Sequence, residues 1–322
     1  MASATKQALL AALSAAQGEC ISGQQLAQQL GVSRAAVHKA AAALAAQGYA
    51  LEAAPRRGYR LAGGDPFCAE AVGPYPAPVQ VYDTLESSNR TAKTLALEGT
   101  PHGTMVLTSQ QTAGRGRLGR RFESPAGKGI YLSLVLRPGL PMTEAQAVTV
   151  SAAVAVCRAV KRLCGLDLGI KWVNDLYYQG KKVCGILTEA ALDLESGMLD
   201  YAVLGLGFNV AAPADGWPED LRDVAGGLYD GSPAPGARAA LAAAFLNAFW
   251  PLYRAGPRSG YLDEYRRRQA LTGQRVLVTP RRGTPRAAQV QGIDDECKLV
   301  VRFDGESRPA ALNSGEVSVR LL

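Results

Sequence analysis

Helical and strand-like patterns of hydrophobic residues alternate through the middle of the chain. Apolar residues recur at helical spacing over residues 144–163 and 237–255. Shorter apolar runs, typical of buried strands, cover residues 103–107, 130–136 and 201–206. A mixture of long helical segments and short strands predicts an α/β or α+β domain in this part of the chain.

Two clusters of Gly and Pro interrupt the pattern early in the chain. Residues 63–66 read Gly-Gly-Asp-Pro, and residues 73–78 read Gly-Pro-Tyr-Pro-Ala-Pro. These residues break helices and strands, so we place a domain boundary near residue 64. After residue 271 the helical pattern gives way to short alternating stretches, which predict a small all-β barrel. Three domains are therefore expected, over residues 1–64, 65–270 and 271–322.

The first of these segments has the pattern of a winged helix-turn-helix. A capping box opens at Ser22, and Gly31 ends the short helix that follows it. Ser33 can cap a second helix over residues 34–47. Two strand-like runs then flank a basic turn at residues 55–58. In this motif the second helix enters the major groove of DNA, and the wing can lie against phosphates.

Charge supports a nucleic-acid partner for this segment. Residues 1–64 hold six basic and two acidic side chains, and the whole chain has a net charge of +7. A small basic domain is a candidate nucleic-acid binder. The alternative is a packing module without a DNA partner. The candidate DNA-contacting residues are Ser33, Arg34, His38, Lys39, Arg56 and Arg57.

Composition sets the class of protein. The chain has 322 residues, of which 48% are hydrophobic and 20% are charged, so disordered, collagenous and fibrous classes are excluded. No apolar run reaches the roughly 18 residues of a membrane span, and the first residues lack a signal-peptide pattern, so a cytoplasmic protein without a membrane partner is expected. The six cysteines are scattered and there are two histidines, which speaks against structural zinc and against a disulfide framework.

Residues 111–121 form the most informative stretch of the chain. Three glycines lie at every second or third position among arginines. Glycines let backbone amides approach an anion, and arginines supply fixed positive charge, so the loop suits a phosphate ester. It lacks the Gly-Lys-Ser/Thr ending of a P-loop. The alternative is a solvated basic surface loop.

Further clusters of polar residues argue for a ligand site. Lys171, Asn174 and Asp175 precede a strand-turn-strand pattern, and the pair Lys181–Lys182 opens the second strand. Residues 205–209 end an apolar strand with two glycines and an asparagine, where backbone can come close to a ligand.

Four motifs in this order resemble the family of bifunctional biotin-protein ligases and biotin operon repressors. The motifs are GRGRLGR (114–120), KWVNDLY (171–177), KKVCGILTE (181–189) and GLGFNV (205–210). The N-terminal pattern, YLDEYRRR (261–268) and SGEVSVR (314–320) are also similar to segments of that family. Lipoate ligases share the general fold, but GRGRLGR points to biotin. The chain departs from the family at Val173, where proline is usual, and at Phe122, where tryptophan is usual.

The resemblance implies an α+β fold in three parts. These are an N-terminal winged helix-turn-helix, a central mixed β-sheet with helices similar to class II synthetases and biotin ligases, and a C-terminal SH3-like barrel. It implies an enzyme that forms biotinyl-5'-AMP from biotin and ATP, with Mg2+, and transfers biotin to a lysine of the biotin carboxyl carrier protein of acetyl-CoA carboxylase.

The resemblance also implies a biotin-responsive repressor. Biotin would then be both substrate and corepressor precursor, and the protein would bind operator DNA as a homodimer while it holds biotinyl-5'-AMP. Two alternatives stay open: a ligase with a non-regulatory N-terminal domain, and a biotin-sensing DNA-binding regulator without catalysis.

Carried over position by position, the resemblance assigns three sets of residues. The biotin set is Ser87, Ser88, Gln111, Gly114, Arg115, Arg117, Lys182, Gly205 and Gly207. The ATP and adenylate set is Arg117, Arg120, Phe122, Asn174 and Asn209. The catalytic set is Lys182, Arg117, Asp175 and Arg115. No metal ligand is assigned.

Overall fold

The computed structural model describes most of the chain in two compact units. The described residues are 2–16, 18–46, 49–54, 57–64, 67–141, 145–193, 195–229, 231, 233–256, 260–281, 283–314 and 317–322. The first unit comprises Met1–Pro74 with Ser232–Ala240, and the second comprises Tyr75–Gly231 with Leu241–Leu322. The boundaries expected near residues 64 and 271 stay predictions. Several positions used in the sequence analysis lie outside the described residues: Gln47, Pro55, Arg56, Asp65, Pro66, Glu144, Gly315 and Glu316.

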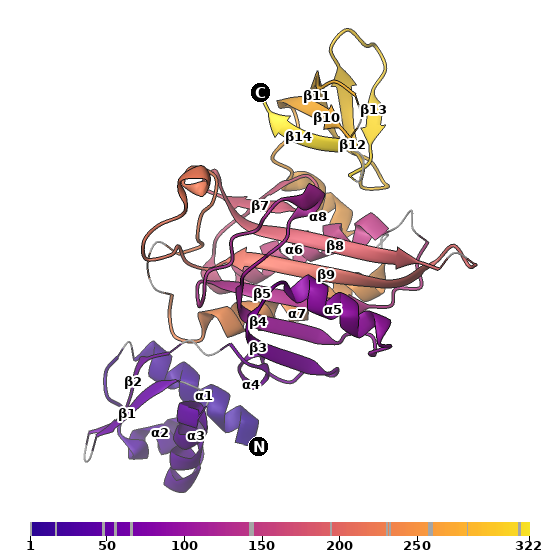
Figure 1. The fold of residues 1–322 in the computed structure, drawn as a ribbon. Helices are drawn as coiled ribbons and strands as arrows, with labels where there is room; N and C mark the ends of the chain where they lie inside the picture. Colours follow the sequence, from indigo (N-terminus) through magenta and orange to yellow (C-terminus); the bar gives the residue numbers. More distant parts are fainter. Residues whose placement is uncertain are drawn as a thin grey trace. The chain divides into compact units, whose positions relative to one another are not determined.

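The first unit is a helix-turn-helix followed by a hairpin (Figure 1). Its elements are α1 (Ala2–Ala15), α2 (Gly23–Leu30), α3 (Arg34–Ala46), β1 (Ala50–Ala54), β2 (Gly58–Gly63) and α4 (Ala69–Val72). The capping box is confirmed, because Ser22 Oγ accepts from Gln25 N at 3.2 Å and Gln25 Oε1 accepts from Ser22 N at 3.1 Å. Gly31 ends α2 in the left-handed conformation, as that position requires.

The first helix, α1, was not predicted from the sequence. Leu9 and Leu13, one helical turn apart, are fully buried in the core of this unit together with Leu26, Val37 and Leu44. The wing is pinned to this core by two backbone hydrogen bonds of 2.9 Å between Ile21 and Tyr59. Gly58 permits that approach, because a Cβ there would lie 2.1 Å from Ile21 O. The hairpin is therefore a fixed part of the unit.

A seven-stranded mixed sheet forms the centre of the second unit. Its strand order is β3-β4-β5-β9-β8-β7-β6, with β3 and β4 parallel and the other neighbours antiparallel. The strands are β3 (Val79–Leu85), β4 (Met105–Gln111), β5 (Gly129–Leu136), β6 (Gly169–Lys171), β7 (Asp175–Tyr178), β8 (Lys181–Leu192) and β9 (Leu199–Asn209). This confirms the predicted central mixed sheet and the strand-turn-strand after Lys171.

Helices cover both faces of this sheet. They are α5 (Ser88–Leu97), α6 (Ala145–Cys164), α7 (Ala237–Ala255) and α8 (Tyr261–Arg267). In Figure 1, α5 lies in front of the sheet and α6 lies behind it. Because both faces are covered, all eight residues of β5 are buried, which explains its largely apolar run in the sequence, interrupted by Ser133.

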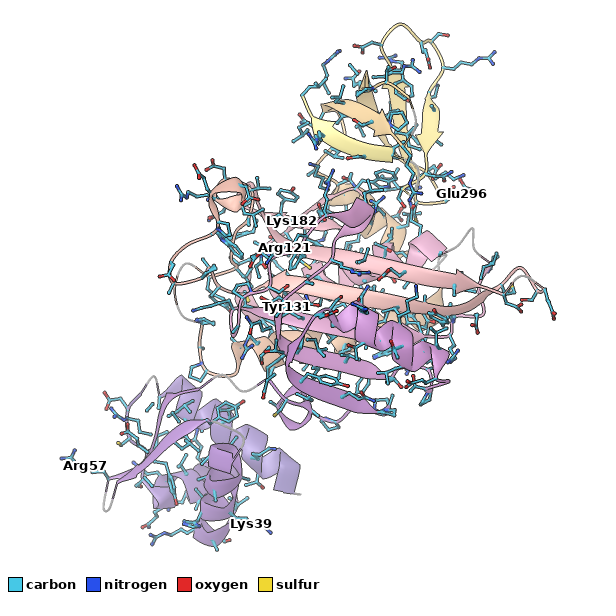
Figure 2. The ribbon with its side chains drawn as sticks, viewed as in Figure 1. Lys39, Arg57, Arg121, Tyr131, Lys182 and Glu296 are labelled. Carbon is cyan, nitrogen blue, oxygen red and sulfur yellow. The ribbon has the colours of Figure 1, made fainter. Side chains whose placement is uncertain are left out.

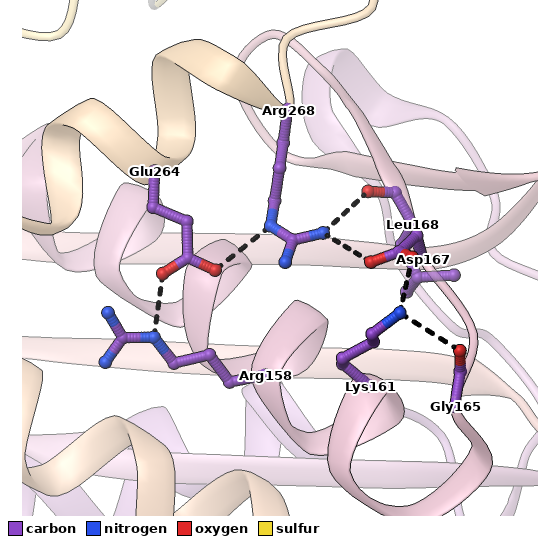
Figure 3. A network of polar contacts seen from close by, with 7 residues as sticks. All are labelled: Arg158, Lys161, Gly165, Asp167, Leu168, Glu264 and Arg268. Carbon is purple, nitrogen blue, oxygen red and sulfur yellow. Dashed lines mark hydrogen bonds and ion pairs between the residues drawn. The ribbon is translucent and has the colours of Figure 1, made fainter.

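A network of ion pairs joins α6, α8 and the segment just before β6 (Figure 3). Glu264 accepts from Arg158 Nε at 2.8 Å and from Arg268 Nε at 3.0 Å. Arg268 O accepts from Ile170 N at 2.8 Å, so the segment after α8 continues the sheet beyond β6. Gln269 Oε1 then accepts from Trp172 N at 3.0 Å. The network thus fixes the start of the KWVNDLY segment.

The C-terminal part of the second unit is an antiparallel sheet of five strands. Their order is β13-β12-β11-β10-β14, with β10 (Arg275–Pro280), β11 (Arg286–Ile293), β12 (Leu299–Phe303), β13 (Ala310–Leu312) and β14 (Val317–Leu321). The predicted all-β character of this segment is confirmed. None of the described helices has the length and apolarity needed to cross a membrane.

The capping box gives a prediction for local stability. Ser22→Ala removes one of the two reciprocal hydrogen bonds, so the free energy of opening of α2 should fall by about 1 kcal/mol. Amide hydrogen exchange of α2 in the full chain should therefore become about fivefold faster.

Ser33 provides the matched control. Its Oγ accepts from Ala36 N at 3.1 Å and caps α3. Ser33→Ala should accelerate exchange at the start of α3 and leave the start of α2 unchanged. Equal effects of both variants on both helices would contradict the assignment of each cap to its own helix.

Candidate functional site

A cavity in the second unit lies over the face of the sheet formed by β8 and β9. It is lined by every residue of the three predicted ligand and catalytic sets except Gly114 and Asn209. The segments that line it come from five parts of the chain: α5, the arginine loop, the KWVNDLY segment, β8 with β9, and β14. Figure 2 shows Lys182 and Arg121 near one another above this sheet.

Glycines leave part of the cavity floor as sheet backbone without side chains. Gly185 of β8 stands opposite Gly207 of β9 in the strand register. The ring of Phe122 rests on this pair, because a Cβ on Gly207 would lie 2.5 Å from Phe122 Cε1 and a Cβ on Gly185 would lie 3.2 Å from Phe122 Cε2. The glycines of the KKVCGILTE and GLGFNV motifs therefore make room for an aromatic ring and for a ligand.

One end of the cavity is a cluster of neutral hydrogen-bonding groups. Gln111 Oε1 accepts from Ser88 N at 2.8 Å and from Ser88 Oγ at 3.1 Å, and Gln111 Nε2 donates to Ser124 Oγ at 2.9 Å. Ser87 and Ser88 are 2% and 4% exposed, so their hydroxyls are held away from bulk water. Such a cluster suits a neutral ligand group with both donors and acceptors.

The other end of the cavity carries positive charge. Lys182 Nζ lies 2.6 Å from Asp175 Oδ1 across the β7–β8 pair. Arg117 donates to Asn174 Oδ1 at 3.3 Å and to the carbonyl oxygen of Ser314. Asn174 Nδ2 in turn donates to Ile186 O at 2.8 Å. The loop arginine is thus tied both to the sheet and to the segment before β14.

Partial burial makes these cations receptive to an anion. Desolvation lowers the pKa of Arg117 and of Lys171, while the charge of Asp175 opposes the shift. Lys182 and Arg120 further lower the pKa of Lys171. Because cations outnumber the single carboxylate here, a bound anion relieves repulsion among them.

Two predicted residues lie outside the cavity lining. Gly114 packs against the loop itself, where a Cβ would lie 2.4 Å from Phe122 O. Asn209 ends β9, is 4% exposed, and its buried Oδ1 has no hydrogen-bond partner within the described chain.

Sequence reasoning missed part of the cavity wall. Lys171, named from the sequence, does line the cavity, and the lining also includes Asn89 and residues Val317–Val319 of β14, which were not assigned. Asn89 follows the serine pair directly and could have been found from that position. That β14 lies in the cavity wall could not be predicted from the sequence pattern. The contacts that place it there, between Arg117 and Ser314 and between Arg120 and Ser318, join residues nearly 200 positions apart.

Among the described residues no group of three or more His, Cys, Asp or Glu side chains could hold a metal ion. Asp175, the carboxylate within the cavity, is paired with Lys182.

The first unit presents a separate cationic face. Arg34, His38 and Lys39 of α3 are exposed, and Arg57 is exposed beside the wing turn. Figure 2 shows Lys39 directed outward from α3 and Arg57 directed away from the hairpin. Arg60 instead forms an ion pair across the hairpin, with its Nη2 2.6 Å from Glu52 Oε2. Arg56 lies outside the described residues.

Comparisons with known proteins match both units. Residues 81–209 match the Biotin/lipoate A/B protein ligase family, and residues 5–60 match an HTH domain family. The chain is 36% identical to the bifunctional ligase/repressor BirA of Bacillus spizizenii, over 79% of this chain and 80% of that protein. It is 35% identical to BirA of Escherichia coli over 61% of each chain.

The fold also matches a solved structure. The biotin protein ligase of Aquifex aeolicus, determined in complex with biotin and ATP, aligns with a TM-score of 0.62 at 23% identity. The alignment covers 76% of this chain and 99% of that chain.

The bare floor gives a prediction for stability. In Gly205→Ala the new Cβ would lie 1.9 Å from Asn89 Oδ1, and Asn89 is buried, so the free energy of unfolding should fall by about 1–3 kcal/mol. Urea unfolding of the full chain measures this change. Gly169→Ala is the control, because its Cβ would meet Ala270 Cβ at 3.9 Å, an ordinary contact. Equal midpoints for both variants would contradict the tight fit of Asn89.

Proposed function

The chain belongs to the BirA family of bifunctional ligase/repressors, and on this basis we propose how its own residues carry out biotin ligation and DNA binding. The cavity of the second unit is the ligase site, which joins biotin to AMP and then to a carrier lysine. The helix-turn-helix unit is the DNA-binding part.

The neutral end of the cavity takes the bicyclic ring of biotin. A ureido group has two N–H donors and a carbonyl acceptor, and Ser87, Ser88 and Gln111 supply complementary groups behind the arginine loop. Gly205 and Gly207 leave space for the ring beside Phe122. Phe122 thus supplies an aromatic ring at the position where the family usually has tryptophan.

The cationic end takes the carboxylate of biotin and the phosphates of ATP. In the first step a biotin carboxylate oxygen attacks the α-phosphorus of ATP, and the bond to pyrophosphate breaks. Negative groups must approach one another, so Lys182, Arg115 and Arg117 act by neutralising charge as the mixed anhydride forms. Arg120, Asn174 and Asn209 are assigned to the nucleotide, with Asn209 offering its unpaired Oδ1 from the end of β9.

In the second step a neutral lysine amine of the carrier attacks the acyl carbon, and AMP leaves. Asp175 is held 2.6 Å from Lys182 and can orient the incoming amine and take its proton. Lys182 then stabilises the negative charge that develops on the acyl oxygen. Because the acyl phosphate reacts with water, the loop around Gly114 keeps it enclosed until the carrier arrives.

Magnesium is assigned to the substrate rather than to the protein. Mg2+ would arrive with the phosphates of ATP and add to the neutralisation of their charge.

One observation carries the ligase proposal: a neutral hydrogen-bonding cluster and a cationic cluster stand at the two ends of one cavity over bare sheet backbone. The direct test is to incubate the protein with biotin, ATP, Mg2+ and a biotin carboxyl carrier domain. A carrier lysine heavier by one biotinyl group is expected, and an unmodified carrier would refute the proposal.

The C-terminal sheet completes the proposed site. We assign it as an SH3-like barrel, because β10 pairs with both β11 and the last strand β14, and Val276 and Val278 alternate inward along it. Its β14 wall would then border the opening used by the carrier domain.

The repressor function assigns operator DNA to the first unit. A single winged domain makes few base contacts, so the protein would bind an inverted repeat as a homodimer that holds biotinyl-5'-AMP. Ser33, Arg34, His38 and Lys39 would lie near base edges or adjacent phosphates, and Arg56 and Arg57 would lie on phosphates.

The lysine pair at the start of β8 allows a matched test of the ligase site. Lys182→Ala should slow formation of biotinyl-AMP by at least about tenfold, which corresponds to about 1.4 kcal/mol, because a cation beside the reacting carboxylate is removed. The neighbour Lys181 is exposed and donates to Arg222 O at 3.1 Å, so Lys181→Ala should keep a near wild-type rate. The rate is measured as pyrophosphate release, and equal rates in both variants would exclude the assignment.

The DNA-binding unit gives a second prediction. Arg34→Ala should weaken binding to the operator more than binding to random DNA, because it removes a side chain that reads bases. Arg57→Ala should weaken both equally and lower the salt slope of binding by about 0.9 for each phosphate that is no longer neutralised. Fluorescence anisotropy at several salt concentrations, with and without biotin and ATP, measures these effects. Parallel losses of affinity on both DNAs for Arg34→Ala would remove it from the base-contacting set.

A further inference from the structure

The KKVCGILTE motif ends in a carboxylate that the ligase chemistry above does not use. Glu189 is half-buried on β8 and does not line the cavity, but its Oε2 accepts from Asn89 Nδ2 at 2.9 Å. Asn89 does line the cavity, directly after Ser88 at the start of α5. A charged group therefore stands directly behind the neutral cluster assigned to biotin.

The partners of Asn89 fix the orientation of its side-chain amide. Asn89 Nδ2 lies 3.2 Å from Leu187 O and 2.9 Å from Glu189 Oε2. A carbonyl and an ionised carboxylate can only accept, so the amide nitrogen must face them. Asn89 Oδ1 must then face Ser133 Oγ, which lies 2.7 Å away. The side chain is wedged against Gly205 and is 4% exposed, so the only change open to it is a turn of the amide group in place, which exchanges Oδ1 and Nδ2.

This orientation determines where the protons of two hydroxyl groups point. Asn89 Oδ1 can only accept, so Ser133 must donate its single proton to it. Ser133 Oγ also lies 2.8 Å from Ser88 Oγ, and that contact can then be made only with the proton of Ser88. The other partner of Ser88 Oγ is Gln111 Oε1 at 3.1 Å, which faces Ser88 because Gln111 Nε2 donates to Ser124.

Both destinations of the Ser88 proton thus lie in the cavity wall, so Ser88 presents lone pairs to the ligand. We propose that Glu189 is a positioning residue which, through Asn89, directs the Ser133 proton away from Ser88 and so keeps the lone pairs of Ser88 free to accept a ring N–H of biotin. This inference rests on the proposed function, since it deepens the assignment of Ser88 to the ureido group. It makes Glu189 a determinant of ligand specificity without contact to the ligand.

Glu189→Gln tests the proposal, because it keeps the shape of the side chain and adds a donor that lets Asn89 turn over. The Michaelis constant for biotin should rise by about tenfold, and that for ATP should stay within twofold of wild type. The matched control is Glu195→Gln, an exposed glutamate in the turn between β8 and β9, which should change neither value.

Discrimination between ligands separates positioning from general damage. The probes are the two cyclic carbamate analogues of biotin, each with one ring N–H replaced by oxygen. Wild-type protein should disfavour one of them by at least about tenfold in kcat/KM, because an acceptor then meets an oxygen. Glu189→Gln should reduce that ratio to about threefold or less. An unchanged ratio in Glu189→Gln would overturn the proposal.

Ser133→Ala provides a second, independent arm. It removes the hydroxyl that links Asn89 to Ser88, so it should reduce the same ratio of kcat/KM values. The double variant Glu189→Gln/Ser133→Ala should lose no more of this discrimination than Ser133→Ala alone. Additive losses of discrimination would contradict the proposed chain from Glu189 through Asn89 and Ser133 to Ser88.

If wild-type protein does not biotinylate the carrier at all, the ligase proposal fails. Equal activity of wild type and variants toward biotin and both analogues refutes only the role of Glu189.

Discussion

The absence of side chains from one patch of a buried sheet is the constraint on which the site depends. Protein interiors are close-packed, so a ligand can reach the face of a covered sheet only where side chains are missing. Gly185, Gly205 and Gly207 supply that gap on two adjacent strands. Asn89 packs against Gly205 and Phe122 against Gly185 and Gly207, and a ligand can occupy the rest of the gap.

The charged end of the site depends in turn on structure far from the cavity. The pairing of Glu264 with Arg158 and Arg268 anchors the segment that extends the sheet beyond β6. From there Gln269 holds Trp172, and Tyr265 donates to Val173 O at 3.1 Å. The strand end that carries Asn174 and Asp175 is thus held from behind by side chains of α8 and its extension, although valine stands where the family has proline.

The sequence predicted those parts of the site whose chemistry is visible within one short segment. Three such segments can be recognised from the sequence, because few structural roles need those residue types together: the arginine loop, the lysine pair and the glycines of β9. The assigned roles of these residues remain proposals. The first helix was missed because its Ala-rich segment shows little contrast between an apolar and a polar face. The contact between Asn89 and Glu189 could not be predicted, because it joins residues 100 positions apart and depends on the register of the sheet.

The wall contributed by β14 has a consequence for how the molecule is made. The cavity is lined from Ser87 to Val319, so nearly the whole chain must leave the ribosome before its last wall exists. The helix-turn-helix unit, by contrast, draws most of its residues from the first 74 and can fold while the sheet is still being synthesised. During translation the DNA-binding surface can therefore form before the catalytic one, at a stage when the nascent chain has the first without the second.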